Sequence, residues 1–213
     1  MIAFALAAFS ALFSVVDPFG VVPVYIAMTA DDLPAHKKRT ALRASVTMAC
    51  ALITFAAVGA YVLRFFGVTI GAFRVAGGVL LFLLAVDMLR AQPSRQRTTP
   101  EEELEGREKP DVSVFPLAIP MLSGPGSFAT VMVLVSRAAN VWQQLIVGAA
   151  IVATAIITYF TLVFSSAAAK RLGKTGLNVL HRVMGLLLAA IAVQFVVDGC
   201  RDVLPSIVQS LAR

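Results

Sequence analysis

The sequence predicts an all-α membrane protein of six transmembrane helices, built as two inverted three-helix repeats, with helices 1 and 4 broken at mid-membrane. Three observations lead to this fold class. Long apolar segments recur along the chain, basic residues gather in every second connection, and a Pro-Gly interruption occurs in the middle of two segments. These observations predict the number of spans, their direction and their breaks, respectively.

The composition is that of a chain immersed in lipid. Of the 213 residues, 59% are hydrophobic and 14% are charged, whereas a soluble domain has about 25% charged residues. Too little polar surface remains to solvate a soluble helical bundle. The net charge of +6 does not indicate a nucleic-acid partner, because the basic residues lie between apolar segments. Cys50 and Cys200 lack the spacing of a metal site, and no cofactor is expected.

Six segments are apolar over a length that crosses a hydrocarbon core, which takes about 20 helical residues. They cover residues 2–29, 44–65, 69–90, 113–136, 142–168 and 178–200. The predicted units are a first three-helix repeat (1–90), a charged cytoplasmic linker (91–112), a second, inverted repeat (113–200) and a C-terminal tail (201–213). The apolar spacing of the tail predicts a short amphipathic helix on the membrane interface.

Lys and Arg differ strongly in number between the two sets of connections. The first, third and fifth connections hold thirteen of the eighteen basic residues, within residues 37–43, 90–109 and 170–182. Cytoplasmic loops carry an excess of Lys and Arg, so these connections are predicted to be cytoplasmic. Both termini are then periplasmic, and the chain is expected in a bacterial inner (cytoplasmic) membrane.

A weak internal repeat relates the two halves. Asp-Pro-Phe-Gly interrupts the first span and Gly-Pro-Gly-Ser the fourth, and their prolines, Pro18 and Pro125, are 107 residues apart. Arg-Val-x-Gly opens both the third and the sixth span, at Arg74 and Arg182, which are 108 residues apart. Because each half holds three spans, the second half must cross the membrane in the opposite direction, as in many secondary transporters.

Both interruptions fall near the centre of their spans, where irregular backbone is tolerated only against protein or a water-filled cavity. Asp before Pro is typical of a helix N-cap, so a half-helix is predicted to begin at Pro18. In the fourth span, Ser123 or Ser127 is predicted to cap a half-helix that continues to Val135. The two N-termini would direct free N–H groups and positive dipole ends at one central site, which suits a small anionic group.

The candidate substrate-binding residues lie in these interruptions: Asp17, Pro18, Gly20, Pro23, Ser123, Gly124, Pro125, Gly126 and Ser127. Asp17 stands out because an ionisable group at mid-membrane is costly and usually functional, with pure helix capping as the alternative.

The other ionisable groups are expected near the interfaces. Asp87 is expected to pair with Arg90, and Asp198 to group with Arg201 and Asp202. Arg74 is expected to extend to the interface, as are His181 and Arg182.

The two interruption motifs resemble those of the MarC family of bacterial and archaeal inner-membrane proteins, also described as the neutral amino acid transporter (NAAT) family. The motifs are residues 17–23 (DPFGVVP) and 116–126 (PLAIPMLSGPG), and the length, spans and linker also agree. The resemblance implies discontinuous first and fourth helices and transport of small neutral amino acids such as glycine and alanine. The matching positions are Asp17, Pro18, Gly20, Pro23, Pro120, Gly124, Pro125 and Gly126. One departure is Val21, where many members have Asn.

The expected function is therefore secondary transport of a small zwitterionic amino acid, with one half rocking against the other. The carboxylate would lie on N–H groups near Gly20 and at residues 124–127, and the ammonium near Asp17 or unwound carbonyls. Asp17 is also the candidate residue for a coupling H⁺ or Na⁺. A passive channel or lipid-binding membrane protein is the alternative. An intramembrane lipid-phosphate hydrolase is disfavoured, because no deep histidine or second carboxylate is expected beside Asp17, so no enzyme is predicted.

Overall fold

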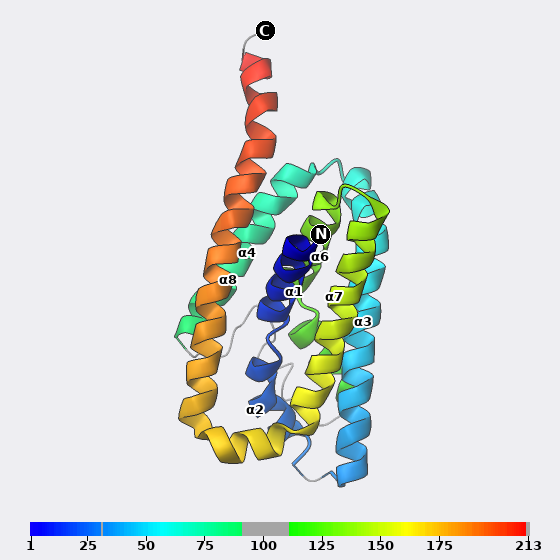
Figure 1. Cartoon of the computed structure of the whole chain (residues 1–213), viewed down its shortest axis with the longest axis vertical. Helices are drawn as coiled ribbons and strands as arrows, with labels where there is room; N and C mark the ends of the chain where they lie inside the picture. Colours follow the sequence, from blue (N-terminus) through cyan, green and yellow to red (C-terminus); the bar gives the residue numbers. More distant parts are fainter. Residues whose placement is uncertain (31, 91–110, 212–213) are drawn as a thin grey trace.

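The computed structural model describes residues 1–30, 32–90 and 111–211, and every regular element within these ranges is helical (Figure 1). Five segments are long and apolar enough to cross a membrane, and a bent pair of helices makes a sixth. The prediction of an all-helical membrane protein with about six spans is confirmed. The predicted linker, 91–112, lies outside the described residues except for its last two positions.

The first span is divided into two helices, α1 (Ile2–Val16) and α2 (Pro18–Met28). The residue between them is Asp17, whose φ of 46° and ψ of 70° lie in the left-handed region. This residue ends α1, and Pro18 begins α2 because its ring fixes a helical φ and it has no N–H to satisfy. The predicted break and the predicted start at Pro18 are both confirmed.

The second and third spans are continuous helices joined by a short turn. α3 (Pro34–Phe65) begins ten residues before the predicted start at 44, because the basic segment 37–43 is helical as well. α4 (Ile70–Leu89) is capped by the Thr69 hydroxyl, which accepts a hydrogen bond from the Ala72 N–H at 3.2 Å. The other boundaries of these two spans agree with the prediction to within one residue.

The fourth span consists of the irregular segment η1 (Ser113–Leu122) and the helix α6 (Pro125–Arg137), which are bent by 59° relative to each other. Two residues of η1 that precede prolines are extended: Phe115 has φ −126° and ψ 128°, and Ile119 has φ −130° and ψ 121°. Proline disfavours a helical conformation in the residue before it. The span is therefore irregular from its first turn, well before the predicted interruption at Gly-Pro-Gly-Ser (124–127).

The last two spans are α7 (Val141–Val163) and α8 (Ser165–Leu211), so α7 ends five residues before the predicted end at 168. α8 begins thirteen residues before the predicted start at 178. It bends at Gly173, whose φ of 62° is readily adopted by glycine. In Figure 1 the first part of α8 crosses the lower end of the bundle and the rest rises beside α4. α8 continues into the tail, whose place on the interface stays a prediction.

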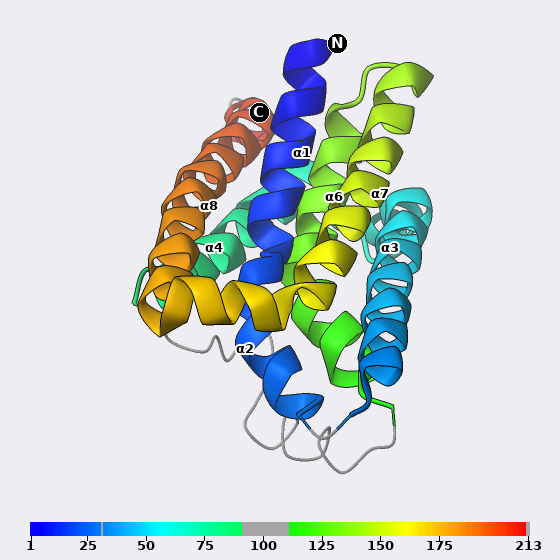
Figure 2. The ribbon, with the colours of Figure 1, turned by 60° about the horizontal axis from the view of Figure 1, so that its bottom comes forward.

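The helices are arranged with the broken spans in the middle (Figures 1 and 2). α4 and α8 lie side by side on one flank, and α3 and α7 lie side by side on the other. Between them, α1 contacts α6, α7 and α8, while α6 contacts α3 and α4. Both interruptions are thus enclosed by protein, as irregular backbone requires at membrane depth.

Small residues set the close approach of α4 and α8. Three small residues spaced by seven on α4 face three on α8, pairwise: Gly71 with Gly199, Gly78 with Ala192, and Ala85 with Gly185. A Cβ on Gly78 would lie 2.8 Å from the Ala192 carbonyl oxygen. A Cβ on Gly199 would lie 2.8 Å from the Gly71 carbonyl oxygen. This small-residue seam lets the two backbones touch, which is how many membrane helices associate.

Large apolar side chains are exposed around the bundle, among them Ile2, Phe65 and Trp142, which are 79%, 85% and 69% exposed. Apolar surface of this extent marks contact with lipid rather than with water. The N-terminus and the α3–α4 and α6–α7 turns lie at the upper end of the bundle in Figure 1, and the α2–α3 and α7–α8 connections lie at the lower end.

The substitution Gly78→Ala is expected to destabilise the protein. Its Cβ would lie 2.7 Å from Val196 Cγ2 and 2.8 Å from the Ala192 carbonyl oxygen, a backbone atom that cannot turn aside. Overpacking of this kind costs about 1–3 kcal/mol. Gly148→Ala on α7 is the matched control, because its Cβ would have no atom within 4 Å. Thermal unfolding in detergent should show a lower melting temperature for Gly78→Ala only; equal melting temperatures would contradict a tight seam.

Candidate functional site

The two broken spans meet at a cavity of about 210 Å³. The residues that line it come from α1, α4, η1 and α6: Val15, Leu80, Leu84, Met121, Gly124, Pro125, Gly126 and Ser127. The end of α1 contacts the start of α6 here, since Val15 Cγ2 lies 3.3 Å from the place that a Cβ on Gly126 would take. The structure therefore brings the two interruptions together, and the second one forms a wall of the cavity.

The N-terminus of α6 has no side-chain cap; Gly124 is its N-cap residue. The Ser123 hydroxyl donates to the Ala118 carbonyl oxygen at 2.6 Å, and the Ser127 hydroxyl donates to the Leu122 carbonyl oxygen at 3.0 Å. Both hydroxyls satisfy carbonyls in the open turns of η1, so the predicted capping of α6 by Ser123 or Ser127 is wrong. The first N–H groups of α6 and its positive dipole end are left at the cavity wall.

At the first interruption, the Asp17 side chain caps the half-helix that follows. Asp17 is completely buried, and its Oδ1 accepts a hydrogen bond from the Gly20 N–H at 3.3 Å, as predicted for an N-cap. The Gly20 N–H also donates to the Asp17 carbonyl oxygen at 3.1 Å, and the Asp17 N–H donates to the Phe13 carbonyl oxygen at 3.0 Å. The Asp17 and Gly20 N–H groups are therefore satisfied within the break.

The second carboxylate oxygen of Asp17 faces His181 on α8. His181 Nδ1 lies 2.8 Å from Asp17 Oδ2, in a close polar contact that lacks the alignment of a hydrogen bond. His181 lies inside the apolar helix Thr175–Val203, directly after the bend, and its expected place at the membrane interface stays a prediction. The premise that no histidine accompanies Asp17 is wrong, because His181 contacts it. No sequence motif links positions 17 and 181; their contact depends on how α8 packs against α2.

The other candidate residues divide between the two interruptions. Residues 124–127 line the cavity, and Ser123 is fully buried next to them. Pro18 is buried at the start of α2, Gly20 lies against Asp17 and His181, and Pro23 is exposed within α2; none of the three lines this cavity. The sequence did not single out the apolar lining residues, which have no feature that separates them from ordinary core residues.

A polar cluster joins α4, α6 and α8 near the upper end. Arg74 on α4 is only 9% exposed; it contacts the Asp202 carboxylate on α8 and donates to Ser136 Oγ on α6 at 2.9 Å. Arg137 on α6 pairs with Asp198 on α8. The upper cluster thus connects three helices by ion pairs between their side chains.

The upper cluster corrects one expectation. Asp198 and Asp202 reach across to α6 and α4 rather than grouping with Arg201, because one face of α8 packs against those helices. Arg74 is buried between the helices rather than extended away from them, and its distance from the membrane interface stays a prediction. Gln194 also belongs here, because its Nε2 donates to Asp198 Oδ1 at 2.8 Å.

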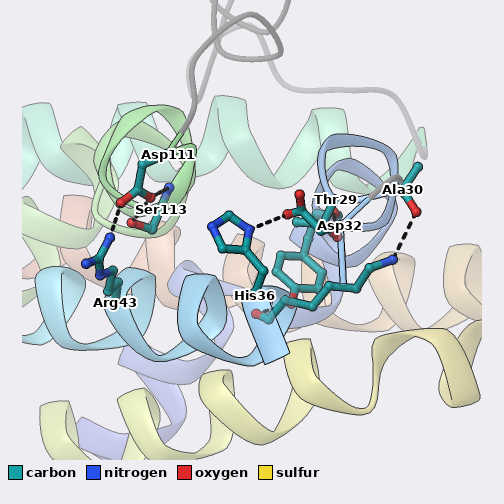
Figure 3. A network of polar contacts seen from close by, with 9 residues as sticks. Thr29, Ala30, Asp32, His36, Arg43, Asp111 and Ser113 are labelled. Carbon is teal, nitrogen blue, oxygen red and sulfur yellow. Dashed lines mark hydrogen bonds and ion pairs between the residues drawn. The ribbon is translucent and has the colours of Figure 1, made fainter. Parts of the chain in front are cut away.

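A second polar cluster lies at the lower end, where α2, α3 and the start of η1 come together (Figure 3). Arg43 pairs with Asp111, whose carboxylate also accepts from the Ser113 hydroxyl and from the Ser113 N–H, the latter at 3.0 Å. Close by, His36 Nδ1 contacts Asp32 at 3.0 Å. The hydrogen bond from the Ser113 hydroxyl, supported by Arg43, holds the pKa of Asp111 below its usual range.

Known proteins resemble the chain over nearly its whole length. Residues 2–204 match the family described as MarC family integral membrane protein. The chain is 39% identical to the UPF0056 membrane protein MJ1677 of Methanocaldococcus jannaschii over 199 residues, 92% of the chain and 96% of the relative. It is 35% identical to YvbG of Bacillus subtilis over 206 residues (96% and 98%), and 31% identical to YhcE of Escherichia coli over 199 residues (93% of each). No solved structure matches.

Asp202→Asn is expected to lower stability, because it removes the charge that faces the buried Arg74 guanidinium. Weakening a charged hydrogen bond costs roughly 1.5–3 kcal/mol, and the half-exposed position of Asp202 places the effect at the lower end of this range. Arg201→Gln, next to it on α8 and exposed, is the control. Thermal unfolding should separate the two variants; a similar melting temperature for both would show that the ion pair contributes nothing.

The lowered pKa of Asp111 makes the contact of α3 with η1 pH-dependent. The carboxyl stays ionised to a lower pH in the folded protein than in the unfolded chain. Its contribution to stability is complete above the unfolded pKa and is lost as pH falls through the folded pKa. Asp111→Asn should therefore melt below the wild type by a constant margin near neutral pH. This margin should begin to close below about pH 4, near the unfolded pKa, and shrink as pH falls further. A margin that does not change on acidification would contradict the ion-pair assignment.

Proposed function

The chain belongs to the MarC family of integral membrane proteins, and from this premise we propose that it is a secondary transporter. Its substrates are small neutral amino acids of the glycine or alanine kind, which cross the cytoplasmic membrane by alternating access, coupled to H⁺ or Na⁺. The observation that carries the proposal is the cavity of about 210 Å³ at which a broken span presents an uncapped half-helix N-terminus. Discontinuous helices of this kind hold the substrate in many transporters.

The cavity suits a small zwitterion. Its volume is below the roughly 300–1,000 Å³ of pockets for drug-sized ligands. The first N–H groups of α6 would hold a carboxylate. Val15, Leu80 and Leu84 form an apolar wall that suits a hydrogen or methyl side chain and disfavours a charged one. The ammonium group would lie on carbonyls of the unwound segment, since the Asp17 carboxylate already faces His181.

Helix boundaries support an inverted repeat. The half-helices α2 and α6 begin at Pro18 and Pro125, and the helices that follow them begin at Pro34 and Val141. Both pairs of starts are separated by 107 residues. Each half then comprises a broken span and two further spans, so the second half runs through the membrane in the opposite direction.

Helix contacts have the same two-fold pattern. α3 contacts η1 and α6 of the second half, and α7 contacts α1 and α2 of the first. The contact of α4 with α6 has its counterpart in the contact of α8 with α2. The contact of α1 with α6 has its counterpart in the contact of η1 with α2. The pairs α3–α7 and α4–α8 are the two that such a symmetry relates to themselves, and they form the flanks of the bundle.

The distribution of basic residues supports a cytoplasmic lower end. The basic segment 37–43 lies at the start of α3, and Arg171 lies in the first part of α8; both parts are at this end in Figure 1. Cytoplasmic ends of membrane helices are enriched in such residues. The N-terminus and the upper end of α8 would then face the outside of the cytoplasmic membrane.

Tight packing indicates which parts move during alternating access. The α4–α8 pair and the α3–α7 pair each join one helix from each half. Rocking one half against the other would separate the helices of both pairs. In the α4–α8 pair it would also require the two backbones to slide along each other where they touch at the small-residue seam. Movement of one flanking pair relative to the other, around the broken spans, leaves both pairs intact and is the motion we favour.

An intramembrane hydrolase is the competing class, because the structure places His181 beside Asp17, where the sequence predicted no histidine. A catalytic acid or base must reach its substrate, and neither residue lines the cavity. Among the described residues that do line it, Ser127 alone has a polar side chain, and its hydroxyl is hydrogen-bonded to Leu122. The same lining disfavours a passive channel, whose selectivity needs rings of polar groups.

Purified protein in liposomes should accumulate labelled glycine and alanine when a proton or a sodium gradient is imposed. Accumulation should exceed that of empty liposomes and collapse when the gradient is dissipated. Asp17→Asn should reduce uptake, because the neutral side chain weakens both the cap of α2 and the contact with His181. Asp32→Asn, which changes a carboxylate at the lower end, is the matched control and should transport normally.

Absence of uptake of both amino acids under either gradient would sink this proposal. Gradient-independent equilibration would favour the passive channel instead. Release of inorganic phosphate from a lipid phosphate monoester included in the same liposomes would favour the hydrolase.

A further inference from the structure

A three-residue contact ties α8 to the break in the first span. Asp17 accepts from the Gly20 N–H with Oδ1 and faces His181 Nδ1 with Oδ2 at 2.8 Å. The Asp17 side chain has no exposed surface, and the His181 side chain is 18% exposed. Polar contacts shielded in this way are stronger than at a surface, so the contact fixes both partners.

Gly20 makes the contact sterically feasible. A Cβ at this position would lie 2.2 Å from Asp17 Oδ2 and 2.8 Å from His181 Cε1. Both distances are far shorter than a van der Waals contact, so the space between α2 and the imidazole accepts only a residue without a side chain. Because Gly20 also donates to Asp17 Oδ1, one residue both orients the carboxylate and admits the ring.

The imidazole is held at a fixed place on the flanking pair α4–α8. Gly185, one turn after His181, lies so close to α4 that a Cβ there would be 2.8 Å from Met88 Cβ and 3.1 Å from the Leu89 nitrogen. The part of α8 that carries His181 therefore moves with α4. Displacement of the α4–α8 pair relative to the first span must act on the Asp17–His181 contact.

We propose that His181 is a positioning residue for transport. It holds the Asp17 carboxylate in its capping place and so fixes the α1–α2 break relative to the α4–α8 pair. The link to turnover rests on the proposed transporter function, whereas the fixing of the break is a property of the fold. His181 is not a substrate ligand in this assignment, because neither it nor Asp17 lines the cavity.

The substitutions His181→Asn and His181→Leu separate the effect of the polar contact with Asp17 from the effect of side-chain packing. Both side chains are branched at Cγ and have nearly the same shape. Asparagine keeps an N–H donor bonded to Cγ, where the imidazole has Nδ1, and leucine keeps none. His181→Asn should therefore retain the contact that His181→Leu loses. Arg182→Gln, at the adjacent exposed position on α8, is the control.

Hydrogen exchange of the first-span break tests the fixing directly and needs no substrate. The Asp17 and Gly20 amides are hydrogen-bonded at the break. In lipid nanodiscs, His181→Leu should raise deuterium uptake of peptides over residues 11–22 about fivefold, the factor for a polar contact worth about 1 kcal/mol. Gly20→Ala should act in the same direction, while His181→Asn and Arg182→Gln match the wild type. Unchanged exchange in His181→Leu would overturn the inference.

Glycine uptake then tests the link to turnover. His181→Leu should lower the maximal uptake rate about fivefold at unchanged KM. This factor corresponds to the same contact, worth about 1 kcal/mol, being needed for the rate-limiting step. His181→Asn should restore the rate. Equal loss in both variants, or a raised KM at unchanged maximal rate, would overturn the positioning role. If the wild type takes up no glycine, the transporter proposal fails, and the exchange experiment still decides whether His181 fixes the break.

Discussion

Two interruptions of helices that are long and apolar enough to cross a membrane are the constraint on which the rest of the structure depends. Each N–H and C=O group freed there must be satisfied by protein or by enclosed polar groups. Side chains at the breaks supply part of this, through Asp17, Ser123 and Ser127. The α3–α7 and α4–α8 pairs enclose the breaks, so the order of the helices in the bundle follows from the same requirement.

The two breaks are alike in sequence but differ in chemistry. At the first, a carboxylate caps the following half-helix and a histidine from the last span covers it. At the second, the serine hydroxyls are directed to carbonyls of η1, and the following half-helix begins at an apolar cavity without a cap. We therefore assign different roles to them: the first break fixes a flanking pair, and the second break offers N–H groups to a small anion.

Polar contacts secure the fourth span at its two ends. At the lower end, Arg43 on α3 pairs with Asp111 just before η1. At the upper end, Arg137 pairs with Asp198 on α8, and Ser136 accepts from Arg74 on α4. The ends of this span are thus tied to helices of both flanks, whereas its middle faces the cavity. Such an arrangement keeps the irregular segment in place while leaving its centre open to a solute.

The sequence by itself determined the features that depend on local chemistry. Apolar length fixed the spans, and Asp before Pro fixed the break and its cap, because these effects act within a few residues of the chain. It did not determine which partners long-range packing would choose. The contact of His181 with Asp17 and the pairing of Asp198 and Asp202 across helices were decided by the bend at Gly173 and the small-residue seam. The apolar lining of the cavity was decided by the packing of α1, α4, η1 and α6. These features place residues far apart in the chain at contact distance, and no periodicity or motif encodes that distance.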